Sequence, residues 1–425
     1  MKPTFRWKNK KQHEVVIEQD YVSTLRAFRP ELNFDQIKSV ILDSRQYLCA
    51  YPDVHEAGSC PIEHYFTYGE NEGRSFYAPK IIGKNVTSRL KNGKKVYISD
   101  VPTDNGIFLY RVMFRMVNEA ESLNTPYHSK IKDIIAAIFS ATEVVFIRPV
   151  NSDRNIYLLS LCRYLNVKIT FDIDDLMLPE YADEKGGIRS GMADYNQMRT
   201  DLVLNSAALI RADELTCTTQ KIADAYSSSV KNYRIVQNKL PKRYFIPDVK
   251  DGNNHTKALP EKLKILYLSG TKTHFKDFSL IGGVLVRLAQ QYPDKFEMNF
   301  MGELKDQSLL FRSLKTSSTF IPYVNFQEML KIISEHHLIL VPLENSEFNN
   351  AKSNIKFIEA ASQSVAIIAS PATEFVNTID NGKDGWLCAN EQQWYDTLEY
   401  LLANPGVAIE TGKNAYYKAL NLYSL

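Results

Sequence analysis

The 425-residue sequence predicts an α/β protein made of two doubly wound domains joined by a linker. Short runs rich in β-branched residues alternate with helical stretches, which is typical of parallel βαβ units. The alternation stops in a polar segment without hydrophobic periodicity, residues 248–260, and then begins again. The hydrophobic content of 44% is sufficient to fill two such cores.

Composition and charge exclude several classes of protein. A formal net charge of +2 argues against nucleic-acid binding by the chain as a whole. The five cysteines are odd in number and scattered, which indicates a reducing compartment and no metal cluster. No apolar run approaches the ~20 residues of a membrane span, and no signal peptide is visible. We therefore expect a soluble cytoplasmic protein.

The N-terminal residues 1–30 form a basic tail. Five positive charges lie within the first eleven residues: Lys2, Arg6, Lys8, Lys10 and Lys11. A disordered tail is one interpretation, and peripheral contact with the anionic inner face of the cell membrane is the other. Residues 31–85 follow as a small helical module, with an amphipathic helix over 34–48 and short helical pieces over 51–77. His64 in this module is expected to be a packed structural residue.

The first α/β domain is expected to span residues 86–247. Its predicted strands are 95–99, 144–147, 168–171 and 214–216, with helical stretches such as 156–165 and 201–212 between them. The second domain is expected over 261–410, with strands at 264–268, 296–300, 338–341 and 365–369. Residues 411–425 are expected to form a C-terminal helix that returns to the first domain.

Ligands of doubly wound sheets bind beyond the carboxyl ends of the strands, so residues just after each strand are candidates. After strand 264–268, Gly270 and Thr271 allow close approach of backbone N–H groups to a phosphate. Lys272 and Lys276 supply cations, and His274 could donate to a phosphate or a sugar hydroxyl. An ordinary connecting loop has a similar composition, and that alternative stays open.

A second candidate segment follows strand 338–341. Asn350 and Ser353 are suited to hydrogen bonding a sugar or a pyrophosphate, and equally to turns and helix caps. A helix is then predicted to carry Lys352, Lys356 and Glu359 on one face. The rise from the first to the last is about 10 Å, which fits a diphosphate at one end and ribose hydroxyls at the other. A solvated face of paired charges is the alternative.

Polar residues also follow the strands of the first domain. Asp104, Asn105 and Gly106 form a loop before a helix that carries Arg111 in its first turns. Three aspartates, Asp172, Asp174 and Asp175, follow strand 168–171 and could bind a metal, act as a base or hold the hydroxyls of an acceptor. An acidic loop with a helix cap is the alternative. Arg148, after strand 144–147, could serve an acceptor or pair with these aspartates.

These segments together resemble one family. LYLSGTKTHFKDF, FNNAKSNIKFIEAASQSVAIIAS and IDNGKDGWL resemble the C-terminal half of GT-B glycosyltransferases of the family-4-like group. FDIDDL and residues 212–240 resemble its N-terminal half. Residues 51–77 look like a module of bacterial polysaccharide glycosyltransferases, including rhamnosyltransferase-like enzymes. The resemblance covers roughly residues 30–425.

The resemblance implies roles for particular residues. Lys276 matches a basic residue that contacts the diphosphate, with Lys272 and His274 nearby. Glu359 matches the second glutamate of the family's paired-glutamate motif, which holds the ribose. The first glutamate of that motif falls on Ala351. The family's glycine-rich loop falls on residues 103–106, where one glycine, Gly106, is retained.

The implied reaction moves a sugar from a nucleoside diphosphate sugar to a hydroxyl of a glycan or lipid-linked glycan. The product would be a bacterial surface polysaccharide such as O-antigen, capsule or S-layer glycan. The resemblance implies an enzyme that retains configuration. No metal or other cofactor is expected, because Lys276, Lys272 and Lys352 neutralise the leaving diphosphate. Asp174 or Asp175 would be a base if the enzyme inverts.

Two other functions stay open at the level of the sequence. Nucleotide-sugar epimerases and glycoside phosphorylases share the architecture. A non-catalytic subunit that binds a glycan or a partner protein through residues 51–77 is the third possibility, since Ala351 replaces a family glutamate.

Overall fold

The computed structural model describes about two thirds of the chain, with gaps. The described residues are 47–48, 51–59, 61–69, 71–74, 94–99, 101–117, 123–126, 134, 137–138, 140–150, 152, 155, 158–159, 162–163, 167–246, 259–270, 275–302 and 318–425. The basic tail, all but the last two residues of the predicted helix over 34–48 and most of the predicted linker lie outside them. Within the described part, no helix combines the length and apolar character that crossing a bilayer requires.

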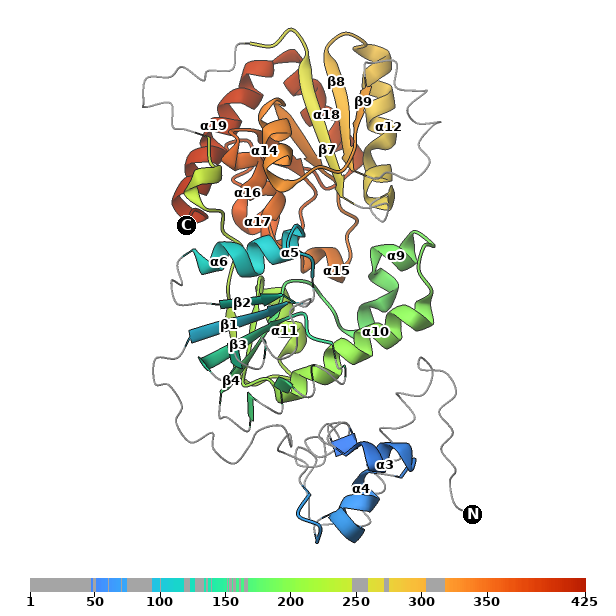
Figure 1. Ribbon diagram of the computed structural model, residues 1–425. Coiled ribbons are helices and arrows are strands. Elements are labelled where there is room, and N and C mark those ends of the chain that lie inside the picture. Colours follow the sequence, from blue (N-terminus) through green and yellow to red (C-terminus); the bar gives the residue numbers. More distant parts are fainter. Residues whose placement is uncertain are drawn as a thin grey trace.

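The first domain contains a parallel six-stranded sheet in the order β2-β1-β3-β4-β5-β6 (Figure 1). All four predicted strands are present, as β1, β3, β4 and β5. The sheet gains β2 and β6, two strands that the sequence did not suggest. The bounds are β1 Lys94–Ser99, β2 Leu123–Pro126, β3 Ala141–Ile147, β4 Lys168–Ile173, β5 Glu214–Cys217 and β6 Tyr233–Ile235.

The second domain contains another parallel six-stranded sheet, in the order β12-β11-β10-β7-β8-β9. The four predicted strands are β7, β8, β10 and β11. The bounds are β7 Leu263–Gly270, β8 Phe296–Gly302, β9 Ser318–Ile321, β10 Leu338–Val341, β11 Ala366–Ala369 and β12 Trp386–Leu387. β10 and β11 are buried throughout, as expected of central parallel strands.

Helices connect the strands of each sheet. In the first domain they are the continuous segment α5–η2–α6 (Gly106–Phe108, Leu109–Met113, Phe114–Met116), η3 Pro179–Glu184, α9 Gly186–Arg189, α10 Tyr195–Ala208, η4 Leu209–Arg211, α11 Gln220–Tyr226 and η5 Lys242–Tyr244. In the second they are α12 Phe275–Gln291, α14 Phe326–Ser334, α15 Glu347–Asn350, α16 Ile355–Ser362, α17 Thr373–Thr378, α18 Glu391–Ala403 and α19 Pro405–Leu422.

Each domain contributes apolar residues to the hydrophobic core of the other. Phe348 and Ala351, from the connection between β10 and α16, belong to the hydrophobic core of the first domain. Conversely, Tyr110 and Phe114 of the first domain pack with residues of the second, and their rings contact that of Phe326. Figure 1 shows the α5–α6 segment between the two sheets. The two domains are therefore joined by a packed interface.

The C-terminal helix differs from the expected short element over 411–425. α19 begins at Pro405 and packs against α16 and β11 of the second domain. Contacts back to the chain leaving the first domain come from Tyr416, whose hydroxyl donates to Ile246 O (2.8 Å), and from the end of the chain. There, Leu240 N donates to Tyr423 O (2.8 Å) and Leu425 N donates to Leu240 O (3.0 Å). The helix thus belongs to the second domain and ties it to the chain leaving the first.

The described part of the N-terminal module consists of α3 Pro52–Glu56, α4 Pro61–His64 and η1 Tyr65–Gly69. Tyr47 lies at its centre, and its hydroxyl forms a 3.0 Å hydrogen bond with His64 Nδ1. The structural role predicted for His64 is confirmed by this contact.

Gly412 should be essential for the packing of α19. A Cβ at this position would lie 2.4 Å from the carbonyl oxygen of Ser364, which is backbone and cannot move aside easily. Gly412→Ala should therefore lower the free energy of unfolding by about 1–3 kcal/mol. Gly283→Ala, also within a helix, is the control, since its Cβ meets only the carboxylate of Glu391 at 3.5 Å. Equal stability of the two variants in chemical denaturation would contradict the close packing.

Candidate functional site

A cavity of 330 Å³ lies between the two domains, at the carboxyl ends of their strands. The first domain contributes Asp174 and Asp175, which follow β4. The second contributes the ends of β7 and β10, the residues that lead into α16, and Phe375 of α17. From the second domain, the polar side chains that line the cavity include Ser269, Lys352, Ser353 and Lys356. The cavity is thus acidic on one side and basic on the other.

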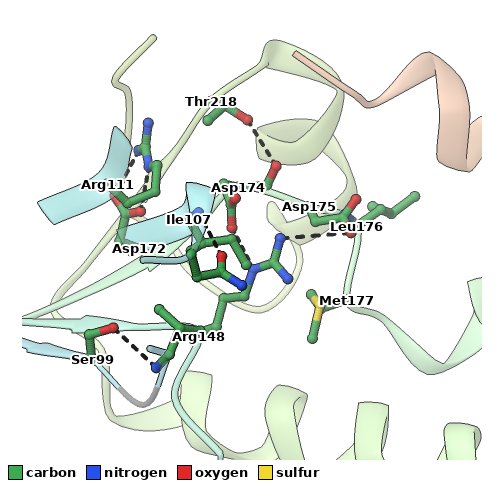
Figure 2. A network of polar contacts seen from close by, with 12 residues as sticks. Ser99, Ile107, Arg111, Arg148, Asp172, Asp174, Asp175, Leu176, Met177 and Thr218 are labelled. Carbon is green, nitrogen blue, oxygen red and sulfur yellow. Dashed lines mark hydrogen bonds and ion pairs between the residues drawn. The ribbon is translucent and has the colours of Figure 1, made fainter. Parts of the chain in front are cut away.

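Arg148 organises the acidic wall (Figure 2). It follows β3 with a left-handed backbone (φ 44°), which costs a residue other than glycine about 1–3 kcal/mol. This conformation aims its side chain at the aspartates: Nε lies 2.5 Å from Asp174 Oδ1 and Nη2 lies 3.8 Å from Asp175 Oδ2. Of the two roles expected for Arg148, pairing with the aspartates is the one observed.

Asp175 is surrounded by cations. Lys185 Nζ lies 3.6 Å from Asp175 Oδ2 on the side of η3 and α9. Burial raises the pKa of Asp175, but Lys185, Arg148 and Lys352 outweigh that effect, so the pKa is lowered. This carboxylate therefore stays charged at neutral pH.

The basic wall corrects one prediction. Lys352 does not share a helix with Lys356 and Glu359, because it lies in the turn between α15 and α16. α15 is capped by Ser346, whose Oγ accepts from Asn349 N (3.1 Å), and α16 begins only after Asn354. The predicted 10 Å spacing along a single helix is therefore wrong. Lys352 reaches the cavity from the turn and Lys356 reaches it from the helix.

Glu359 lies outside the wall of the cavity. It is 4% exposed, and it accepts hydrogen bonds from Lys356 Nζ (3.0 Å) and from the hydroxyl of Tyr110 (3.4 Å). The contact with Tyr110 crosses from one domain to the other. Glu359 therefore fixes Lys356 and the domain interface, and Lys356 stands between it and the cavity.

The other predicted residues of the second domain are distributed unevenly. Ser353 lines the cavity, and its Oγ accepts from Asn238 Nδ2 (3.0 Å) of the first domain. Asn350 instead donates to Asn345 Oδ1 (3.0 Å) within its own turn. Gly270 ends β7 beside the cavity. Lys276 is exposed in the first turn of α12 and is absent from the cavity wall among the residues described. The remaining predicted residues Thr271, Lys272 and His274 lie outside the described residues.

The loop before α5 does not form part of the cavity wall. Asn105 caps α5, with its Oδ1 accepting from Ile107 N (2.8 Å). Asp104 is exposed, and the space around Gly106 is open. The predicted role of Asp104, Asn105 and Gly106 in binding an acceptor stays a prediction.

Asp172 and Arg111 require a correction. Their side chains are 0% and 1% exposed and form a bidentate ion pair (Figure 2). Arg111 Nε lies 2.7 Å from Asp172 Oδ1, and Arg111 Nη2 lies 2.8 Å from Asp172 Oδ2. Arg115 and Thr216 also bind Oδ2 of the aspartate. Burial raises the pKa of Asp172, but the two arginines lower it to about 2. An acceptor cannot reach this pair, so the expected role in acceptor binding is wrong.

Two residues at the site were missed by sequence reasoning. Asp277 is buried at the start of α12, where its Oδ1 accepts from Glu344 N (3.0 Å) and Asn349 Nδ2 (3.2 Å) and so anchors the segment that carries Lys352. Lys185 contacts Asp175. An aspartate between Lys276 and a phenylalanine, and a lysine before two glycines, carried no signal that could have distinguished them.

Comparison with known proteins locates a family within the chain. Residues 262–404, which include the whole second sheet and the basic wall, match the family described as Glycosyl transferases group 1. This match covers about a third of the chain, the part that forms the second domain. A comparison with curated protein sequences gives no significant match.

Solved structures extend the likeness to both domains. HepE from Anabaena, in complex with UDP, has a TM-score of 0.56 at 10% identity over 78% of this chain and 96% of HepE. Sucrose-phosphate synthase from Thermosynechococcus elongatus gives 0.53 at 14% identity over 78% and 95% of the chains. A glycosyltransferase from Rickettsia africae gives 0.50 at 13% identity over 79% and 95%. The protein therefore has the GT-B fold, which confirms the predicted fold class, and the group 1 match falls in its second domain.

The Asp172–Arg111 pair should contribute strongly to stability. Asp172→Asn leaves two arginines buried beside a neutral amide, and we expect a loss of about 3–5 kcal/mol in the free energy of unfolding. Glu214→Gln, which disrupts the surface pairs with Lys168 and Arg234, should lose no more than about 1 kcal/mol. Because the pKa of Asp172 is lowered on folding, its contribution is present above about pH 4 and is lost as the pH falls toward 2. Similar losses for both variants in urea titrations would refute this ranking.

Proposed function

We propose that the protein is a glycosyltransferase that moves a sugar from a nucleoside diphosphate sugar to a hydroxyl of a glycan acceptor. The observation that carries this proposal is the cavity between a group 1 domain and the facing domain, with lysines on one side and carboxylates on the other. Structural neighbours support it, since HepE is described in complexes with UDP and with UDP-glucose. The cavity volume also falls in the range of small-molecule sites.

The donor is proposed to lie on the basic wall. Ser269 and Gly270 end β7, where backbone N–H groups can approach a phosphate closely. Lys352 and Lys356 then supply the cations for the diphosphate. Burial lowers the pKa of Lys352, with Asp277 and Asp175 opposing that effect, and a bound anion would raise the pKa and favour the charged ammonium. Lys276, in the first turn of α12, and Lys272, which follows β7 in the sequence, are proposed as further contacts of the diphosphate.

The chemistry depends on the charge of the leaving group. Cleavage of the C–O bond leaves negative charge on the diphosphate, and the lysines stabilise this charge more in the transition state than in the ground state. These cations make a metal ion unnecessary for the proposed reaction. On the opposite wall, Asp174 binds Arg148 through Oδ1, and Oδ2 has no hydrogen-bond partner among the described residues. We infer that Oδ2 accepts a hydrogen bond from the acceptor hydroxyl. As the new C–O bond forms to the sugar, the hydroxyl proton passes to the departing diphosphate, in a reaction that retains configuration.

The biological acceptor is proposed to be a growing bacterial surface polysaccharide, O-antigen, capsule or S-layer glycan, free or linked to lipid. The resemblance of residues 51–77 to a module of rhamnosyltransferase-like enzymes supports this choice. A lipid-linked acceptor would bring the protein to the inner face of the membrane, where the basic N-terminus would find anionic lipid.

A non-catalytic role is the second candidate, and Ala351 favours it. This residue stands where the family has its first glutamate, and it is 2% exposed within the core of the first domain. The chain therefore uses this position for packing between domains. Binding of nucleotide sugars without transfer to any acceptor or to water would support this role over catalysis.

Nucleoside diphosphates should bind the protein and depend on Lys352. They should raise the melting temperature, because a ligand that binds only the folded state stabilises it. Lys352→Gln should weaken their binding at least tenfold in calorimetry, because a half-buried cation of the basic wall without an ion-pair partner among the described residues is lost. Lys331→Gln, an exposed position on α14, is the control and should bind as the wild type does. Unchanged binding by the Lys352 variant would exclude the proposed orientation of the donor.

The proposed ribose contact of Glu359 can be separated from its structural contact. If Glu359 turns toward a bound ribose, Glu359→Gln should weaken nucleoside binding several-fold. Tyr110→Phe removes only the 3.4 Å contact with Glu359 and should leave nucleoside affinity unchanged. Equal effects of the two substitutions on affinity and on stability would assign Glu359 to the domain interface alone.

A further inference from the structure

Two ammonium groups from different domains lie against the same aromatic ring. Lys185 Nζ of the first domain is 4.3 Å from the centroid of the Phe348 ring, and Lys352 Nζ of the second is 5.1 Å from it. Phe348 itself belongs to α15, which Figure 1 shows between the second sheet and α9–α10 of the first domain. The two cations therefore meet where the domains meet, beside the cavity.

Lys185 is buried without a strong acceptor. It is 8% exposed, and its nearest partners among the described residues are Asp175 Oδ2 at 3.6 Å and Met177 Sδ at 3.9 Å. Charged hydrogen bonds of an ammonium are normally about 2.7–2.9 Å long, and it has three N–H donors to satisfy. Burial is the main cause that lowers the pKa of Lys185. A buried cation in this state is unfavourable unless an anion completes its coordination.

The ammonium group of Lys352, from the second domain, also has no close anionic partner among the described residues. It lines the cavity, and it forms no hydrogen bond or ion pair within 4.0 Å among the residues described. Its turn is held by other groups: Thr219 Oγ1 donates to Ala351 O at 2.9 Å, and Lys352 N donates to Asn349 O at 3.2 Å. The position of this ammonium therefore does not depend on its own charge being paired.

No carboxylate approaches either lysine at hydrogen-bond distance among the described residues. Arg148 engages Asp174 closely, and Asp175 lies 3.8 Å from Arg148 Nη2 and 3.6 Å from Lys185 Nζ. Asp277 also attracts Lys352, but the two form no ion pair within 4.0 Å among the described residues. A phosphate-bearing ligand in the cavity would offer both ammonium groups the closely bound anion that these carboxylates do not provide.

We propose that Lys185 and Lys352 together bind the diphosphate of the donor, so that the leaving group is held by cations of both domains. This rests on the proposed function for the identity of the anion. Lys185 then joins the donor site from the domain otherwise assigned to the acceptor. Departure of the nucleoside diphosphate would leave two ammonium groups facing each other across the interface, which favours separation of the domains and release of the product.

The test compares three full-length variants with the wild type. Lys185→Gln removes the cation, Lys185→Arg restores it, and Lys221→Gln is the matched control. Lys221 also joins the first domain to α15, through a 3.3 Å ion pair with Glu347, but both side chains are largely exposed and away from the cavity. Calorimetry would measure the affinity for UDP and for uridine, followed by the corresponding pairs of the other nucleobases.

The expected result is specific to the diphosphate. Lys185→Gln should weaken binding of the nucleoside diphosphate at least tenfold and leave binding of the nucleoside within twofold, while Lys185→Arg and Lys221→Gln stay within about threefold of the wild type. The ligand-free Lys185→Gln variant should melt at or above the wild-type temperature, because removal of an under-paired buried cation relieves an unfavourable charge.

Other results would overturn the inference in distinguishable ways. If the wild type binds nucleoside diphosphates and Lys185→Gln binds them equally well, Lys185 has no part in the donor site, while the proposed function stands. If the variant melts lower and loses affinity for nucleoside and diphosphate alike, Lys185 is structural. If the wild type binds no nucleoside diphosphate at all, the proposed function fails, and this inference fails with it.

Discussion

The arrangement of the site depends on the insertion of one short segment of the second domain into the first. Phe348 and Ala351 join the hydrophobic core of the first domain, and burial of a phenylalanine side chain contributes about 1.5–3 kcal/mol. Polar contacts fix the same segment in place: Glu184 Oε2 accepts from Phe348 N at 2.6 Å, and Thr219 Oγ1 donates to Ala351 O at 2.9 Å. Because Lys352 follows Ala351 directly, this packing brings the basic wall to the acidic one.

The fold was largely accessible from the sequence, because central parallel strands are continuous apolar runs. β10 and β11 are examples, and each of the eight predicted strands was found. The missed strands are of another kind. β6, with the sequence YRI, is exposed throughout, and β12 has only two residues. Such short strands at a sheet edge form because a neighbour offers hydrogen bonds, and hydrophobic periodicity does not report that.

The site could be predicted from the sequence only in part, because the sequence does not show which way a side chain points or whether it is buried. Position after a strand correctly led to Asp174 and Asp175, which line the cavity. The same reasoning failed for Asp172, because this residue lies inside β4, where a side chain can point into the domain and meet Arg111. Likewise, charge spacing placed Lys352 on a helix that begins three residues later. Sequence distance shows which residues are near one another, and it does not show which way they face.

Preorganisation explains how the buried Lys185 and the half-buried Lys352 keep their positions before any ligand arrives. Backbone contacts set the position of Lys185: its N–H donates to Ala182 O at 3.2 Å, and its carbonyl accepts from Ile188 N at 2.9 Å at the start of α9. The turn of Lys352 is anchored in the same manner, by hydrogen bonds of its main chain and of Ala351. Neither lysine relies on a carboxylate to hold it in place, so each keeps donors for an incoming anion. Dipoles and charges fixed in advance need little reorganisation when charge develops on a leaving group, and this is the condition under which they stabilise a transition state most. An interface that packs through apolar groups and leaves its cations under-paired meets that condition.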